Sequence, residues 1–325
     1  MPQMATASAP ASIGNVGVGY DVLGLAFDAV RDTITARRVD RPGVHLGQVS
    51  GLTDSLPAEV HKNCALAAAH ALIASQAPGL GVELDIHKGV PMSAGMGGSA
   101  ASAVAAAAAV NALLETPLET PDLLLHAIEG ERVSADPPPW DNVMASLLGG
   151  LVIAARLDPP LIRRLPLPEG YACVLFHPNR KIETQMAREL LSETVSHAVA
   201  VEHGRNLAGF LAGCALGDEA LIEAGLQDIL VEPQRLPLLP ELAGVQSAAI
   251  GAGALGCSFS GSGPSVFAWC RAADKTAVRD AMARAFADAD CEARAYDAPI
   301  LSDGVTVERV SDTPVHESLQ EKAAS

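Results

Sequence analysis

The strongest chemical signal in the chain is a glycine-rich run between two segments of regular pattern. Residues 81–87 alternate apolar and polar side chains, which predicts a half-buried strand, and residues 100–114 are mostly alanine, which predicts a helix. Glycines at this junction let backbone N–H groups approach phosphate oxygens, and the helix start adds unpaired N–H groups and a positive dipole end. We therefore predict a phosphate-binding loop formed by Pro91, Met92, Ser93, Ala94, Gly95, Met96, Gly97, Gly98, Ser99, Ala100, Ala101 and Ser102.

The type of this loop is limited by the patterns that it lacks. It contains no GxxxxGK[ST] sequence, which excludes a Walker A loop, and no acidic strand end follows at the distance that a dinucleotide fingerprint requires. Taken alone, a glycine-rich connection into a closely packed alanine helix explains the run equally well. The phosphate interpretation therefore depends on the rest of the chain.

Two further glycine-rich segments could present polar groups to a ligand. Residues 10–21 place three glycines, Asn15 and Asp21 between two apolar runs, which suits a tight turn that carries short polar side chains. Residues 251–256 and 260–265 are rich in glycine and serine. Each segment on its own is more often an ordinary turn or loop.

The elements that must position these segments mix helices and strands in both halves of the chain, which predicts an α+β protein. Two proline-rich stretches, at residues 136–139 and 158–168, interrupt the pattern. We place a domain boundary near residue 165, which gives domains 1–165 and 166–325, and expect a frayed polar tail after Val310. Buried strands are predicted at 149–154, 171–176 and 265–269, and helices at 184–192, 196–216 and 275–287.

Composition and charge narrow the class of protein. The formal net charge of −16 argues against binding to nucleic acid or to an anionic membrane. The alanine run is too short and too weakly hydrophobic to span a bilayer, and the N-terminus lacks the features of a signal peptide. Six cysteines without a CxxC pair or metal-ligand spacing are typical of a reduced compartment, so we expect a cytoplasmic protein.

Together, the three glycine-rich segments resemble the three signature motifs of the GHMP small-molecule kinases, in the same order and spacing. The run P-M-S-A-G-M-G-G-S-A-A-S is the most specific of them, and the first motif, Asn15 followed by V-G-V-G-Y-D-V-L-G, is similar to the form found in homoserine kinases. Residues 141–150, 184–188 and 232–235 resemble further segments of that family. The resemblance therefore extends over most of the chain.

The resemblance implies a fold and a reaction. The fold is a two-domain GHMP kinase fold, with a left-handed βαβ unit in the N-terminal domain, a ferredoxin-like C-terminal domain and the site between them. The reaction is ATP-dependent phosphorylation of L-homoserine to O-phospho-L-homoserine in threonine biosynthesis, with ATP as co-substrate and Mg²⁺ as cofactor. The sequence leaves both a monomer and a homodimer open.

Residue by residue, the resemblance also implies roles in phosphoryl transfer. Ser99 and Glu131 correspond to the hydroxyl and carboxylate that hold Mg²⁺, which prefers oxygen ligands and keeps several waters. Thr184 and Asn142 correspond to residues near the γ-phosphate. Asp141 corresponds to a general base in some relatives, although in homoserine kinases an aspartate here is thought only to hold the substrate. Without the resemblance, Glu131 would be interpreted as a solvated helix residue.

Homoserine is a zwitterion with a primary hydroxyl, and the resemblance supplies a partner for each group. Arg188 and Arg235 match positions that bind the carboxylate, for which a guanidinium fork is well suited. Asp21 is the candidate partner of the ammonium, and Asn15 of the reacting hydroxyl. In the absence of the family match, the two arginines would be surface charges and the other two residues turn caps.

Three departures from the family pattern concern the substrate rather than the chemistry. Pro139 stands where homoserine kinases usually have a histidine, Trp140 follows it, and Gln234 replaces a usual tyrosine. A kinase for another small alcohol, such as mevalonate or shikimate, is therefore an alternative, although Asp21 favours a substrate with an amine. A non-catalytic binding relative is a second alternative, against which Glu131 and the full glycine loop argue.

Overall fold

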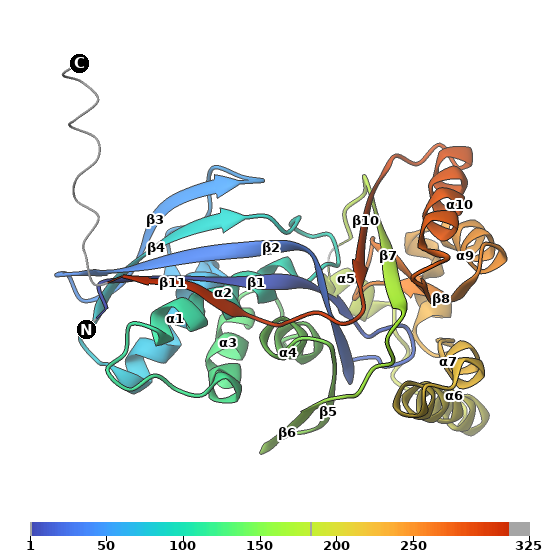
Figure 1. Ribbon diagram of the computed structural model, residues 1–325, viewed down its shortest axis with the longest axis horizontal. Helices are drawn as coiled ribbons and strands as arrows, with labels where there is room; N and C mark the ends of the chain where they lie inside the picture. Colours follow the sequence, from blue (N-terminus) through green and yellow to red (C-terminus); the bar gives the residue numbers. More distant parts are fainter. Residues whose placement is uncertain (1, 183, 312–325) are drawn as a thin grey trace.

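The strands form two separate sheets in the computed structural model, which describes residues 2–182 and 184–311 (Figure 1). The first sheet runs β11–β1–β2–β4–β3, and a hairpin of β5 and β6 extends it from β2. These strands are β1 (Met4–Gly14), β2 (Leu23–Val39), β3 (Gly43–Gly51), β4 (Gly81–Lys88), β5 (Leu151–Leu157), β6 (Pro160–Arg164) and β11 (Thr306–Ser311).

The second sheet has four antiparallel strands in the order β10–β7–β9–β8. Its members are β7 (Tyr171–Pro178), β8 (Ala254–Phe259), β9 (Val266–Arg271) and β10 (Ala293–Pro299). Strands β3 and β4 of the first sheet pair in parallel through helix α1 and so form a βαβ unit. The α+β class expected from the sequence is confirmed.

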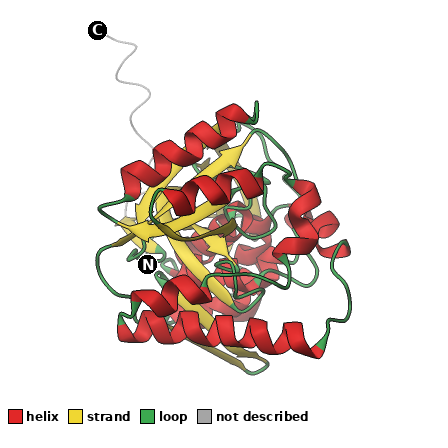
Figure 2. Cartoon of the chain, turned by 90° about the vertical axis from the view of Figure 1, so that its right-hand side faces the viewer, coloured by secondary structure: helices red, strands yellow, loops and turns green. Residues whose placement is uncertain are grey.

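Helices pack against one face of the first sheet and against the second sheet, which a view at right angles to Figure 1 also shows (Figure 2). Against the first sheet lie α1 (Cys64–Gln76), α2 (Gly98–Asn111) and α4 (Trp140–Leu148), and α3 (Leu124–Glu131) packs on these three helices. The second half adds α5 (Thr184–Glu189), α6 (His197–Leu216), α7 (Glu219–Gly225), α8 (Glu232–Arg235), α9 (Leu242–Gly251) and α10 (Lys275–Asp288). No helix in residues 2–182 and 184–311 is long and apolar enough to cross a membrane.

The predicted elements are found with small shifts at their ends. Helices expected at 196–216 and 275–287 are α6 and α10, but the helix expected at 184–192 ends at Glu189. It ends early because the backbone N–H of Leu191 closes a turn on Arg188, and that of Ser192 donates to the Gln234 side chain. The expected frayed tail lies, from residue 312 on, outside the described residues.

Helix α2 is the centre of the first core. Residues 100–111 of this helix are all buried, and they pack against β1, β2, α1, α3 and α4. Alanine side chains allow these elements to approach closely on every side, which accounts for a large core with few aromatic residues. The loop before α2 is therefore attached to the most enclosed element of the chain.

The two sheets meet along an interface that the chain crosses more than once. One buried core joins α2 and the first sheet to Leu175 and Trp269 on the second sheet, and a separate core lies between the second sheet, α9 and α10. The last strand, β11, returns from the second half to pair with β1. The division at residue 165 stays a prediction.

A buried ion pair fixes the end of β4 just before the glycine-rich loop. The Lys88 ammonium binds Asp32 on β2 and donates to the Ser102 hydroxyl (2.8 Å) and the Gly98 carbonyl (2.9 Å). Asp32 and Lys88 are 0% and 3% exposed. The other Asp32 oxygen accepts from the backbone N–H groups of residues 89 and 90. This network anchors both ends of the loop, and the sequence motifs did not reveal it.

We expect Lys88→Met to destabilise the fold strongly, because it leaves the Asp32 carboxylate buried without a cation. Breaking a buried pair from one side costs about 3–5 kcal/mol, which urea unfolding would measure. The matched control is Lys62→Met, whose partner Glu59 is solvent-exposed and whose loss should change the unfolding midpoint little. If both variants unfold at the same urea concentration, the buried pair does not anchor this region.

Candidate functional site

A cavity of about 540 Å³ lies where the two sheets meet, and all three regions of glycine-rich sequence reach it. Its volume is in the range of small-molecule sites. Of the third region, Gly261, Ser262 and Gly263 line the cavity, whereas residues 251–256 form the end of α9 and the start of β8. The three predicted motifs thus meet at one place.

Backbone hydrogen bonds hold the three segments together. The Ser12 N–H donates to the Met96 carbonyl (3.0 Å), and the Gly261 N–H donates to the Gly14 carbonyl (3.0 Å). The Ser260 hydroxyl donates to the carbonyl of Gly95 (2.6 Å). Each of the three segments is therefore hydrogen-bonded to both of the others.

The glycine-rich loop ends in a glycine that the geometry requires. Gly97 caps the start of α2 with a φ of 65°, in the left-handed region that favours glycine. A Cβ atom at Gly97 would lie 2.0 Å from the Ser12 hydroxyl oxygen. Eight of the twelve predicted loop residues line the cavity; the exceptions are Pro91, Met96, Ala100 and Ala101. The backbone therefore passes close to the cavity, as anion binding at a helix start requires.

Glu131 and Ser99 form an oxygen-rich pair beside this loop. Glu131 is 1% exposed, and its Oε1 accepts from the hydroxyls of Ser99 (2.6 Å) and Ser134. Its other oxygen, Oε2, is buried without a hydrogen-bond partner among the described residues. Burial raises the pKa of this carboxyl to about 7. A buried, unpartnered carboxylate oxygen beside a hydroxyl suits a hard divalent cation.

Asp141 is held between the first segment and the start of α4. Its Oδ2 accepts from the Asn15 backbone N–H (2.9 Å), and its Oδ1 accepts from the backbone and side-chain N–H groups of Asn142. Asp141 is 2% exposed, and burial raises its pKa to about 6. A Cβ atom at Gly14 would lie 2.6 Å from Oδ2, so glycine is needed for this approach. The carboxylate is ionised at neutral pH and rigidly placed.

The Ser12 hydroxyl orients the neighbouring amide. It donates to Asn142 Oδ1 at 2.9 Å, although the two residues lie far apart in the sequence. Because the amide oxygen is occupied in this way, the Asn142 NH₂ group is left for Asp141 and the cavity. Ser12 belongs to the first motif, but its role could not be read from the spacing.

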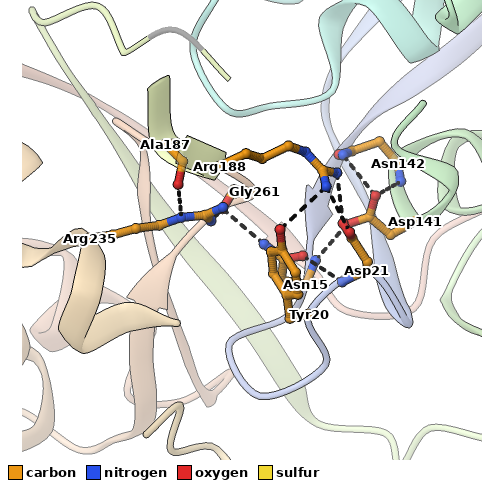
Figure 3. Close-up of polar contacts among 9 residues, drawn as sticks. All are labelled: Asn15, Tyr20, Asp21, Asp141, Asn142, Ala187, Arg188, Arg235 and Gly261. Atoms are coloured by element: carbon orange, nitrogen blue, oxygen red, sulfur yellow. Dashed lines mark hydrogen bonds and ion pairs between the residues drawn. The ribbon is translucent and has the colours of Figure 1, made fainter. Parts of the chain in front are cut away.

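The residues predicted to bind the two ends of a zwitterion bind one another here (Figure 3). Arg188 forms a bidentate pair with Asp21, from Nη1 to Oδ2 (2.9 Å) and from Nη2 to Oδ1 (3.0 Å). Asn15 supports the turn that carries Asp21, because its Oδ1 accepts from the Asp21 backbone N–H (3.0 Å). The pair joins the first half of the chain to helix α5.

Arg235 is a buried cation of a different kind. It is 3% exposed, and it donates only to backbone carbonyls, those of Ala187 (3.1 Å) and Gly261 (3.0 Å). Within the described residues no carboxylate lies within ion-pair distance of it. Burial lowers its pKa, because a charged guanidinium is less well solvated inside the protein. A buried guanidinium that lines a cavity without a counter-ion indicates an anion site.

The remaining predicted positions differ in their relation to the cavity. Thr184 lines it and contacts the Ser262 hydroxyl at 3.3 Å. Pro139 also lines it, whereas Trp140 packs against the core. Gln234 does not reach the cavity, because its side chain donates to the Leu230 carbonyl and accepts from a loop N–H. Of Pro139, Trp140 and Gln234, only Pro139 lines the cavity.

Comparisons with known proteins identify the family to which this fold belongs. The family GHMP kinases N terminal domain matches residues 63–150, and GHMP kinases C terminal matches residues 210–288. A homoserine kinase of Xanthomonas campestris pv. campestris is 45% identical over 301 residues, and one of Xylella fastidiosa is 43% identical over 303 residues; each match covers 92% of both chains. The crystal structure of homoserine kinase from Cytophaga hutchinsonii has a TM-score of 0.90 and 34% identity, covering 95% of this chain and 98% of that one.

The burial of Glu131 predicts an unusual dependence of stability on pH. Its folded pKa of about 7 lies above the ordinary value of 4.5, so in metal-free buffer its contribution is present below pH 4.5 and is lost as the pH rises through 7. Glu131→Gln should therefore gain about 2–3 kcal/mol relative to the parent between pH 5 and pH 8. Urea unfolding at both pH values measures this.

The matched control is Glu129→Gln on the exposed side of the same helix, which also removes one negative charge. Parallel stability curves for the parent and the Glu131→Gln variant would show that this carboxylate is solvated.

Proposed function

The chain belongs to the homoserine kinases of the GHMP kinase family, and we propose that it transfers the γ-phosphate of ATP to the side-chain hydroxyl of L-homoserine. The products are O-phospho-L-homoserine and ADP. The observation that carries the choice of substrate is Arg235, a buried cation at the cavity wall without a carboxylate partner. It lies beside the Asp21–Arg188 pair. A zwitterionic amino acid has an ammonium that suits Asp21 and a carboxylate that the two arginines can share.

Binding of the amino acid is proposed to exchange partners within this group. The substrate ammonium would take the place of Arg188 at Asp21, and its carboxylate would bind the released Arg188 together with Arg235. The exchange conserves charge, so no buried ion is left unpaired. A hydroxy acid without the amine would bind the arginines but leave Asp21 without its cation. Asn15 retains one side-chain N–H for the hydroxyl, because the other donates to Gly261.

The phosphates of ATP are assigned to the glycine-rich loop and the start of α2. Backbone N–H groups of the first helical turn have no partner within the helix, and the dipole there favours negative charge. Thr184 and Asn142 also line the cavity and are assigned to the γ-phosphate where it would meet the hydroxyl. In a loose transition state, such positioning contributes more than covalent chemistry does.

Glu131 and Ser99 would hold Mg²⁺. The unpartnered Oε2 of Glu131 and the Ser99 hydroxyl supply the protein oxygens, and phosphate oxygens and water complete the set that this ion prefers. When bound, the ion neutralises charge on the phosphates.

We also propose a cytoplasmic location, which the six free cysteines support.

Asp141 is assigned to the substrate hydroxyl. With a pKa of about 6 it is ionised at neutral pH and can accept a hydrogen bond from that hydroxyl. Three N–H donors already bind its two oxygens, which weakens it as a base. We infer that Asp141 mainly orients the hydroxyl and accepts its proton only as the O–P bond forms.

The reaction is tested by measuring ADP release with Mg²⁺ and ATP against homoserine, mevalonate, shikimate and galactose. We expect homoserine to give the highest kcat/KM. Glu131→Gln should lower kcat about 100-fold or more, because it removes the charge that faces the cation. Faster ADP release with mevalonate or shikimate would overturn the choice of substrate. A near-normal kcat for the variant would overturn the metal site.

The role of the two arginines is tested by measuring the KM of homoserine and the KM of ATP in each variant. Arg235→Leu leaves the substrate carboxylate partly unpaired, at about 2–5 kcal/mol, so the homoserine KM should rise about 30-fold or more. Arg188→Leu should act similarly, and Arg→Lys should restore only part of the loss, since an ammonium cannot form the bidentate fork. The KM for ATP should stay within about threefold.

The control for these variants is Arg205→Leu on the exposed side of α6, which should leave both KM values unchanged. Unchanged homoserine KM values in both cavity variants would mean that these arginines do not bind the carboxylate.

A further inference from the structure

Tyr20 lies between the two arginines of the cavity, and none of the roles assigned above uses it (Figure 3). The Arg188 guanidinium carbon is 5.8 Å from the centre of its ring, and that of Arg235 is 5.3 Å away. The Tyr20 hydroxyl also accepts a hydrogen bond from Arg188 Nη1 at 3.3 Å. One aromatic side chain therefore contacts both cations.

We propose that Tyr20 is a positioning residue that holds Arg188 and Arg235 side by side for one carboxylate. This inference rests on the proposed function and adds a specificity residue to the same site. Its basis is that both contacts are within the cation–π range of about 6 Å. The negative face of the ring offers favourable potential to two groups that repel each other.

The two arginines differ in the partners that stabilise their positive charge. Arg188 has the Asp21 carboxylate, whereas Arg235 has only two carbonyl oxygens and the ring. The positive charge of Arg188 acts on Arg235 in the unfavourable direction. Without the ring, only the two carbonyl groups would hold Arg235 against the repulsion from Arg188. The Arg235 side chain would then no longer be held in one orientation.

The backbone turn that carries Tyr20 forms within the first half of the chain, without the arginines. The Gly19 N–H donates to the Asn15 carbonyl, and the N–H groups of Val22 and Leu23 donate back to the Gly19 carbonyl. A Cβ atom at Gly19 would lie 2.3 Å from the Leu23 side chain, so glycine is required for this turn. Tyr20 is thus preset by the first half of the chain, while both arginines come from the second half.

Removing the Tyr20 ring should affect only the end of the cavity that is assigned to the amino acid. Tyr20 contacts the two carboxylate-binding groups, and the glycine-rich loop assigned to ATP is held by other residues. Loss of the ring should therefore weaken homoserine binding and leave ATP binding alone. Since the ring does not touch the reacting atoms in this assignment, kcat should change much less than KM.

The test is steady-state kinetics on Tyr20→Leu and Tyr20→Phe, varying homoserine and ATP separately. We expect Tyr20→Leu to raise the homoserine KM about tenfold, the order that a desolvated cation–π contact supplies. Its kcat and ATP KM should stay within about threefold of the parent. Tyr20→Phe keeps the ring and should restore the homoserine KM to within about threefold. A Phe variant as impaired as the Leu variant would overturn the role of the ring.

A double-mutant cycle separates action through the arginine from a general loss of structure. In the Arg235→Leu background, Tyr20→Leu should raise the homoserine KM by clearly less than tenfold, because only Arg188 is left for the ring to position. Full additivity, a tenfold effect in both backgrounds, would overturn the proposal. If Tyr20→Leu shows no cooperative unfolding transition, Tyr20→Met replaces it as an apolar side chain of greater length without a π face.

The parent enzyme distinguishes this inference from the proposed function. A parent that turns over homoserine, with an unchanged homoserine KM in Tyr20→Leu, contradicts the role of Tyr20 alone. A parent that releases no ADP with homoserine contradicts both.

Discussion

The site depends on the close approach of three backbone segments that lie far apart in the sequence. Their contacts join Ser12 to Met96, Gly14 to Gly261, and Ser260 to Gly95, mostly through main-chain groups. Such contacts are possible only where side chains are absent, since added Cβ atoms at Gly95 and Gly97 would lie 2.5 Å and 2.0 Å from atoms of an opposite segment. The cavity exists because glycines allow these segments to touch.

The same region concentrates buried charges that differ in how completely they are paired. Asp32 and Lys88 neutralise each other beneath the glycine-rich loop and stabilise its two ends. Glu131 keeps a buried oxygen without a partner, and Arg235 keeps a guanidinium with carbonyl partners only. Incomplete pairing lowers the stability of the free protein, and it also leaves free energy that a ligand of opposite charge can recover on binding.

Prediction from the sequence succeeded where consecutive residues form the feature. The strand at residues 81–87, the glycine-rich run and the alanine helix are adjacent in the chain, so local pattern alone predicted both elements and the turn between them. It failed for side chains whose partners come from elsewhere. Asp32, Lys88 and Ser12 belong to no recognisable spacing, and Tyr20 stood inside a motif between two residues that were singled out.

By itself, the sequence determined the α+β class, the order of strand, glycine-rich run and helix, and the family resemblance, because these depend on local pattern and motif order. The tertiary structure alone decided how the charges combine. Asp21 and Arg188 are 167 residues apart and pair only because α5 lies against the first turn. Arg235 lacks a carboxylate because the chain places carbonyls and an aromatic ring around it. Which charge stays open to a ligand depends on distances across the interface between the two halves, and no spacing along the chain encodes those distances.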